Sequence, residues 1–186
     1  VSDESNNFSP ERLREKMQTS EKKIRLVAIT GASNVTGSMP PIREVSRIVH
    51  EYGAELLVDA AQLIACRPVD ILSPDHPERI DYLGFSAHKM YAPFGVGVLI
   101  GPRKSFLNGR PHAVGGGTVD LVTLDDILWT DLPEREEAGT PNLIGVVALA
   151  EAIDALYDIG WNFIINHSRA LTKKLLKELG GLPGIT

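Results

Sequence analysis

The sequence is poor in the features that mark secreted and membrane proteins. It contains one cysteine in 186 residues, so it cannot form an internal disulfide and nothing points to secretion. No stretch approaches the roughly 18 consecutive apolar residues that a transmembrane helix requires. The N-terminus also lacks the charged and then apolar pattern of a signal peptide. These absences predict a cytoplasmic protein that does not act at a membrane.

A strong excess of one charge is also missing. The chain has 19 Lys and Arg against 24 Asp and Glu, for a net charge of −5, and no basic run. This balance argues against nucleic acid as the main ligand. At 43% hydrophobic residues, the chain is too apolar to be disordered. Domains commonly hold about 100–200 residues, so the length leaves room for one domain and part of a second.

Apolar strands and helices alternate along the chain. Apolar, β-branched runs predict buried strands at residues 24–30, 55–59, 80–86 and 96–100. Capping signals and helical spacing of apolar residues predict helices at residues 11–17, 41–52, 143–159 and 161–179. Residues 66–79 and 101–137 are expected to be connectors and long loops. The alternation predicts an α/β fold with a largely parallel sheet.

In such folds, ligands bind beyond the carboxyl ends of the strands. The first motif in such a place is TGASNVTG at residues 30–37, which is similar to the dinucleotide-binding turn of the short-chain dehydrogenases. However, Val35 stands where the middle glycine would allow close approach of a pyrophosphate. The Tyr-x-x-x-Lys pair of that family is also absent. An NAD(P)-binding protein is kept as one alternative.

Two further motifs follow strands. In VDAAQ (58–62), Asp59 ends an apolar strand, where a carboxylate is costly to bury without a cationic partner. Taken alone, it is better explained as a cap of the following turn. In SAHK (86–89), the apolar and aromatic surroundings of Lys89 favour a nucleophilic amine. A solvated loop lysine explains that motif equally well.

Taken together, the two motifs match what a pyridoxal-phosphate (PLP) site needs. Lys89 can form the Schiff base, and Asp59 can pair with the pyridine nitrogen so that the ring stays an electron sink. Gln62 can hydrogen-bond the phenolic oxygen of the ring. Ser86 and His88 can donate hydrogen bonds to the phosphate.

The run from about Leu26 to Ile159 resembles the class V aminotransferase family of fold-type I PLP enzymes. Within that family it is most similar to the cysteine desulfurase and selenocysteine lyase group. The resemblance rests on SNVTG (33–37), VDAAQ (58–62), SAHKMYAPFGVGVLIG (86–101), GGG (115–117) and EAGTPN (137–142). It implies a three-layer α/β/α large domain with a mostly parallel sheet, PLP as the cofactor and an amino acid as the substrate.

The resemblance also implies roles for individual residues. Lys89 would be the lysine that binds PLP, with Asp59 at the pyridine nitrogen, Gln62 at the phenolic oxygen, and Ser86 and His88 at the phosphate. Asn34 would lie near the ring. Thr140 would reach the phosphate of the neighbouring subunit, because these enzymes are homodimers with the active site at the interface. A simpler explanation is that Thr140, with Pro141 behind it, is the N-cap of a buried helix, and it can do both.

Parts of the family pattern are missing. Nothing before Leu26 resembles the family's phosphate-binding turn or ring-stacking residue, and no small C-terminal domain with a substrate-binding Arg and a catalytic Cys follows. The chain, which starts at Val1, is therefore expected to be a segment of a longer protein. Residues 1–159 would form the C-terminal portion of the large domain, and residues 160–186 a helix leading toward the small domain. Cys66 is expected to be a small, buried or half-buried residue, and no histidine pair has the spacing of metal ligands.

The favoured function is therefore that of the PLP-binding core of a cysteine desulfurase or selenocysteine lyase, acting on an amino acid through Lys89. An aminotransferase or another PLP lyase of the same group is a close alternative. A folded domain without catalytic competence is a further one.

Overall fold

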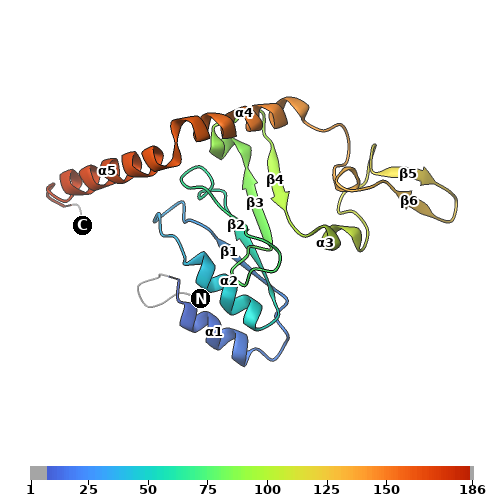
Figure 1. The fold of residues 1–186 in the computed structure, drawn as a ribbon, viewed down its shortest axis with the longest axis horizontal. Helices are drawn as coiled ribbons and strands as arrows, with labels where there is room; N and C mark the ends of the chain where they lie inside the picture. The colour runs from blue at the N-terminus through green and yellow to red at the C-terminus, as the bar shows by residue number, and fades with distance from the viewer. Residues whose placement is uncertain (1–7, 185–186) are drawn as a thin grey trace.

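The computed structural model describes residues 8–184, and Figure 1 shows the arrangement of its elements. The first is helix α1 (Pro10–Thr19), which Ser9 caps: its hydroxyl accepts a hydrogen bond from the Arg12 backbone N–H at 3.2 Å. Pro10 occupies the first helical turn, where a missing N–H costs nothing. The helix predicted at residues 11–17 from capping signals is confirmed, and it extends from residue 10 to residue 19.

A four-stranded sheet forms the centre of the molecule, with its strands in chain order. β1 (Leu26–Thr30), β2 (Glu55–Asp59) and β3 (Tyr82–Ser86) are parallel, and β4 (Gly97–Ile100) pairs antiparallel with β3. The predicted α/β class with a mostly parallel sheet is confirmed. All strands except β2 begin one or two residues later than predicted.

Helices α1 and α2 (Ile42–Glu51) cover one face of this sheet (Figure 1). Alternate residues of the strands point toward them, because successive side chains of a strand project to opposite faces. The core contains residues that are at most 3% exposed: Leu13, Val45, Ile48, Val49, Leu56, Val58 and Leu83. Burying a side chain of this kind contributes about 1.5–3 kcal/mol.

The opposite face of the sheet is open. Leu26 of β1 is 48% exposed and Leu99 of β4 is 58% exposed, and the half-buried Leu57 and Tyr82 lie between them in the register. Within residues 8–184, the chain thus supplies the sheet and one of the two helix layers that a three-layer fold contains.

A buried ionic cluster joins α2 to the start of β3. The Asp81 side chain is 3% exposed; one carboxylate oxygen accepts from the His50 Nε2 at 2.7 Å and the Leu56 N–H at 2.8 Å, and the other accepts from the Arg79 Nε at 2.9 Å. Burial opposes ionisation, but the hydrogen bonds from His50 and Leu56 and the charges of His50 and Arg79 outweigh it. The pKa of Asp81 is therefore lowered.

A second core forms where α4 (Leu143–Ile159) crosses the short 3₁₀ turn η1 (Ala87–Met90) that follows β3. Leu149 and Leu156 of α4 pack there against Ala87 and Met90. At the start of the helix, however, Leu143 is 69% exposed. The range of α4 is confirmed, but the prediction of a buried helix is wrong, because only one stripe of its surface meets the described chain.

Gly160 separates α4 from the last helix, α5 (Trp161–Leu179). Its φ of 87° lies in the region that only glycine adopts without strain. This confirms the predicted break. α5 has no buried residue, and it extends away from the sheet (Figure 1).

The segment predicted as long loops, residues 101–137, is only partly irregular. It contains α3 (Arg103–Leu107), an antiparallel hairpin of β5 (Val119–Val122) and β6 (Ile127–Trp129), and the 3₁₀ turn η2 (Glu134–Glu136). Arg135 is 7% exposed and ties the segment together, donating to the carbonyls of Leu107 at 3.3 Å and Gly109 at 2.7 Å. These elements could not be predicted because they are too short and exposed to leave a periodic pattern in the sequence.

Candidate functional site

The carboxyl ends of the parallel strands meet at one edge of the sheet. Thr30, Asp59 and Gly84 are register partners across β1, β2 and β3. The pairing continues beyond the strands, because the Gly31 N–H donates to the Asp59 carbonyl at 2.7 Å and the Ala60 N–H donates to the Gly84 carbonyl at 2.8 Å. Neighbouring strands are about 4.8 Å apart, so the loops that leave them start side by side.

Asp59 and Ser86 share the open face of the sheet. Asp59 is the register partner of Gly84, and Ser86 lies two residues further along β3, so all three project to the same face. A Cβ added at Gly84 would meet nothing within 4 Å. The sheet therefore offers a flat, uncovered floor beside the Asp59 carboxylate, of a shape that accepts a planar ring.

The Asp59 side chain is exposed, and one of its oxygens accepts a hydrogen bond from the Ala61 N–H at 2.9 Å. The interpretation as a turn cap is confirmed for this oxygen. The second oxygen has no hydrogen-bond partner among residues 8–184, so a ligand group can take it. Gln62 is half-buried in the same turn.

The turn η1 positions Lys89. Residues three apart share a side of a 3₁₀ helix, and the pair Ala87 and Met90 is buried under α4, at 0% and 4% exposed. The two residues between them are thus directed away from that core: His88 is exposed and Lys89 half-buried. Neither side chain makes a hydrogen bond or ion pair with the described part of the chain. The structure thereby brings Lys89, His88, Ser86 and Asp59 to one edge with polar groups available.

Asn34 is exposed in the loop after β1. Two N–H groups of this loop donate to the Ser33 side-chain oxygen at 3.2 Å each, so they are not offered to a phosphate. α2 starts only at Ile42, directly after two prolines that have no N–H. The N-terminus of α2 therefore does not open directly from the loop, as it does in a dinucleotide-binding turn, and this geometry does not favour the NAD(P)-binding interpretation.

Thr140 is exposed in the turn before α4, and it does not cap that helix. The cap is Asn142, whose Oδ1 accepts from the Gly145 N–H at 3.0 Å. The predicted Thr140 cap is therefore wrong by two residues. Asn142 could have been predicted as the cap from the sequence, since Asn caps helices at least as well as Thr and this residue directly precedes the apolar run. The Thr140 hydroxyl makes no hydrogen bond within residues 8–184.

Cys66 is exposed, so the prediction of a buried or half-buried residue is wrong. It lies in the turn that follows β2, where Leu63, at 6% exposed, takes the inward position.

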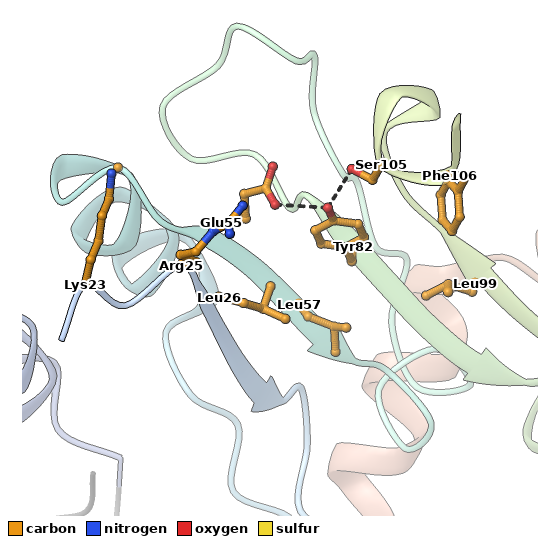
Figure 2. Close-up of a pocket in the computed structure, with 10 residues that line it drawn as sticks. Lys23, Arg25, Leu26, Glu55, Leu57, Tyr82, Leu99, Ser105 and Phe106 are labelled. Atoms are coloured by element: carbon orange, nitrogen blue, oxygen red, sulfur yellow. Dashed lines mark hydrogen bonds between the residues drawn. The ribbon is translucent and has the colours of Figure 1, made fainter. Parts of the chain in front are cut away.

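The hollow drawn in Figure 2 lies on the open face, at the amino ends of the strands. The Tyr82 hydroxyl there donates to Glu55 Oε2 at 2.9 Å and lies 2.7 Å from the Ser105 Oγ. Burial raises the pKa of Tyr82, and Glu55 adds to this effect while the hydrogen bond from Ser105 opposes it. Asp59 lies four positions after Glu55 on β2, a distance of about 13 Å, so this hollow is separate from the candidate site.

Among residues 8–184, no group of three or more His, Cys, Asp or Glu side chains is arranged to hold a metal ion. None of the helices in that part of the chain has the length and apolar character needed to span a bilayer.

The fold and the edge define an α/β protein with a candidate site around Lys89 at the carboxyl ends of its strands. Comparison with protein families makes this specific: residues 2–186 match the family model described as aminotransferase class-V. The chain belongs to this family.

Relatives within the family share a name. The chain is 38% identical to a probable cysteine desulfurase of Halalkalibacterium halodurans, an alignment that covers 91% of this chain and 41% of the relative. It is 37% identical to a cysteine desulfurase of Escherichia coli, covering 89% of this chain and 40% of the relative. The chain therefore spans about two fifths of the length of the curated relatives it matches.

Solved structures of cysteine desulfurases are also similar to this chain. The apo structure of a cysteine desulfurase from Thermococcus onnurineus superposes with a TM-score of 0.84 at 32% identity, covering 100% of this chain and 46% of that one. A cysteine desulfurase structure from Escherichia coli gives a TM-score of 0.78 at 35% identity, over 86% of this chain and 39% of that one.

Proposed function

We propose that this chain is the cofactor-binding core of a PLP-dependent cysteine desulfurase and that Lys89 is the residue that binds the cofactor. The observation that carries the proposal is the group of unpaired polar side chains at the carboxyl edge: Lys89 and His88 from η1, Ser86 from β3, and the second oxygen of Asp59 from β2. The names of the relatives support the choice of reaction.

The residues present fit the cofactor. PLP, when bound, supplies an electron sink for the bonds at the Cα of an amino acid. The flat floor at Gly84 suits its ring, and the Asp59 carboxylate would keep the pyridine nitrogen protonated. Gln62 and Asn34 would contact the ring from the loops after β2 and β1.

Residues at the end of β3 and in η1 would bind the phosphate and transfer the proton. Ser86 and His88 would donate hydrogen bonds to the phosphate. The Lys89 amine, when free, would take a proton from the substrate Cα and return it. Such general acid–base steps typically contribute 10²–10⁴-fold in rate.

We also propose that the protein works as a homodimer in which Thr140 reaches the phosphate in the partner's site. Support comes from the exposed Thr140 side chain, which the described chain leaves without a hydrogen bond. We propose no role for nucleic acid. The cytoplasmic location stays a prediction.

The domain organisation is a further proposal. Residues 1–159 would be the C-terminal portion of the large domain, and residues 160–186 would lead toward a small domain. Two uncovered surfaces support this: the open sheet face with exposed Leu26 and Leu99 (Figure 2), and α5, which has no buried residue.

The test is to incubate the purified chain with PLP, reduce it with borohydride and map the labelled residue by mass spectrometry. We expect the label at Lys89, and none at that position in Lys89→Arg. Lys104→Arg, which changes an exposed lysine of α3, is the matched control and should label like the wild type. Failure to label Lys89 at saturating PLP would refute cofactor binding by this chain.

The reaction is tested by adding cysteine to the loaded protein. Formation of alanine supports the desulfurase, whereas formation of an oxo acid supports the aminotransferase alternative. Labelling at Lys89 with no turnover of cysteine supports a domain without catalytic competence.

A further inference from the structure

The loop that carries Lys89 contains two strained residues. Tyr91 has a φ of 66° and Phe94 a φ of 75°, in the left-handed region that side chains other than glycine rarely adopt. Their rings are 76% and 62% exposed, so packing of the rings does little to hold this backbone. Backbone bonds close the loop at its base, where the Ala87 N–H donates to the Val96 carbonyl at 2.8 Å. A strained loop persists only where its surroundings over-determine it.

The start of α4 provides a further hold on this loop. The Asn142 Nδ2 donates a hydrogen bond to the Phe94 carbonyl, 48 residues away in the sequence. The Oδ1 of the same amide accepts from the Gly145 N–H at 3.0 Å. The two bonds fix the orientation of the amide, because a carbonyl can only accept and an N–H can only donate.

The helix and the loop are also in direct contact. A Cβ added at Gly145 would collide with the Val96 Cγ2, and it would lie 2.9 Å from the Asn142 Nδ2. Only glycine at this position allows the first turn of α4 to approach the end of the loop so closely. Asn142 and Gly145 therefore form one contact surface against residues 94–96.

We propose that Asn142 is a positioning residue for Lys89. Its amide couples the cap of α4 to the Phe94 carbonyl, holds the left-handed backbone of the loop in place, and so fixes the direction of the Lys89 amine. This role rests on the proposed function, in which Lys89 binds PLP. Asn142 touches neither cofactor nor substrate; it acts through the backbone of the loop.

The variant Asn142→Asp separates this role from helix capping. Aspartate caps a helix as well as asparagine, but its carboxylate can only accept hydrogen bonds and cannot donate to the Phe94 carbonyl. Asn142→Ser likewise keeps a capping oxygen but is too short to span to that carbonyl. A role limited to capping predicts wild-type behaviour for both variants.

The first measurement needs no cofactor. Hydrogen exchange of the full chain is followed by mass spectrometry in peptides that cover residues 87–96 and in peptides from the interior of α4. In Asn142→Asp we expect exchange at least tenfold faster in the loop and unchanged exchange in α4. Unchanged exchange in the loop would overturn the proposal, and so would equally faster exchange in both regions.

The second measurement is PLP titration, read from the visible band of the bound cofactor and from the borohydride label at Lys89. We expect about tenfold weaker binding in Asn142→Asp and Asn142→Ser, equivalent to about 1.4 kcal/mol, and a shifted pH dependence of the visible band. Wild-type affinity and pH dependence in both variants would overturn the role of Asn142 alone. A wild-type chain without label at Lys89 would overturn the proposed function, and this role with it.

Discussion

The ionic cluster at Asp81 allows a stability prediction to be worked out in detail. Asp81→Asn keeps the shape of the side chain. It removes the charge and replaces one carboxylate oxygen with an NH2 group, which can only donate hydrogen bonds. The amide can no longer accept from His50, the Leu56 N–H and Arg79 together. Breaking a buried ion pair from one side costs about 3–5 kcal/mol, and we expect about 3 kcal/mol here because the amide keeps one acceptor.

The assay is urea unfolding of the chain followed by circular dichroism. With a slope of about 2 kcal/mol per molar urea, a loss of about 3 kcal/mol lowers the midpoint by about 1.5 M. Glu78→Gln is the matched control. It removes the same charge from an ion pair with Arg47, in which the Arg47 side chain is 54% exposed and the Glu78 side chain 30% exposed. Such exposed pairs contribute about 0–1 kcal/mol.

The pH dependence follows from the lowered pKa of Asp81. The unfolded carboxyl, with a pKa near 3.9, binds its proton at a higher pH than the folded one, so acid favours the unfolded state. The stability contributed by the Asp81 charge is complete above about pH 4 and is lost as the pH falls through the lower, folded pKa. The difference between wild type and Asp81→Asn should therefore be constant from pH 7 to about 5 and shrink below about pH 4. A difference under about 1 kcal/mol at pH 7 would refute this reasoning, as would a loss equal to that of Glu78→Gln.

Four other predictions follow from the structure. Gly145→Ala should lose about 1–3 kcal/mol of unfolding free energy in the same assay, because its Cβ would collide with Val96; a loss under about 0.5 kcal/mol would show that the contact can relax. Cys66 should react with a thiol reagent in the native protein within the time needed for the unfolded chain, because it is exposed, and Cys66→Ser should change stability by less than about 0.5 kcal/mol. Asp59→Ala should weaken PLP binding by about 10–100-fold, the loss expected for one hydrogen bond to a charged group; unchanged affinity would contradict its place at the pyridine nitrogen. Absorbance titration should show that the Tyr82 hydroxyl, assigned by its loss in Tyr82→Phe, ionises with a raised pKa, and the stability that this contributes should be lost as the pH rises through that pKa.

The sheet and most of the candidate site could be predicted from local sequence. The strands are short apolar runs, and the site residues lie at or just after their carboxyl ends, so chain order and sheet pairing already bring Lys89, Asp59 and Ser86 to one edge. Ser9 and Gly160 are likewise local signals, since a cap and a left-handed break act within a few residues.

The features that were mispredicted depend on contacts between distant segments. Thr140 and Asn142 are both acceptable caps, and the choice between them involves the Phe94 carbonyl, which no local pattern reveals. Much of the α4 surface is exposed because little of the described chain packs against this helix. Cys66 is exposed because Leu63 occupies the inward position of their shared turn. The segment that contains the hairpin of β5 and β6 is closed by Arg135, which donates to the carbonyls of residues 26 and 28 positions earlier.

The strand order of the sheet bears on how the molecule acquires its shape. Each strand pairs with the one made just before it, so the sheet can grow as the chain leaves the ribosome, without waiting for distant segments. β4 is the last strand to join, and the connection that must turn back to let it pair is residues 87–96, which contain Lys89. Pairing of β4 with β3 thus turns residues 87–96 back at the carboxyl edge of the sheet and brings Lys89 to that edge, before the start of α4 adds its hydrogen bond to the same loop.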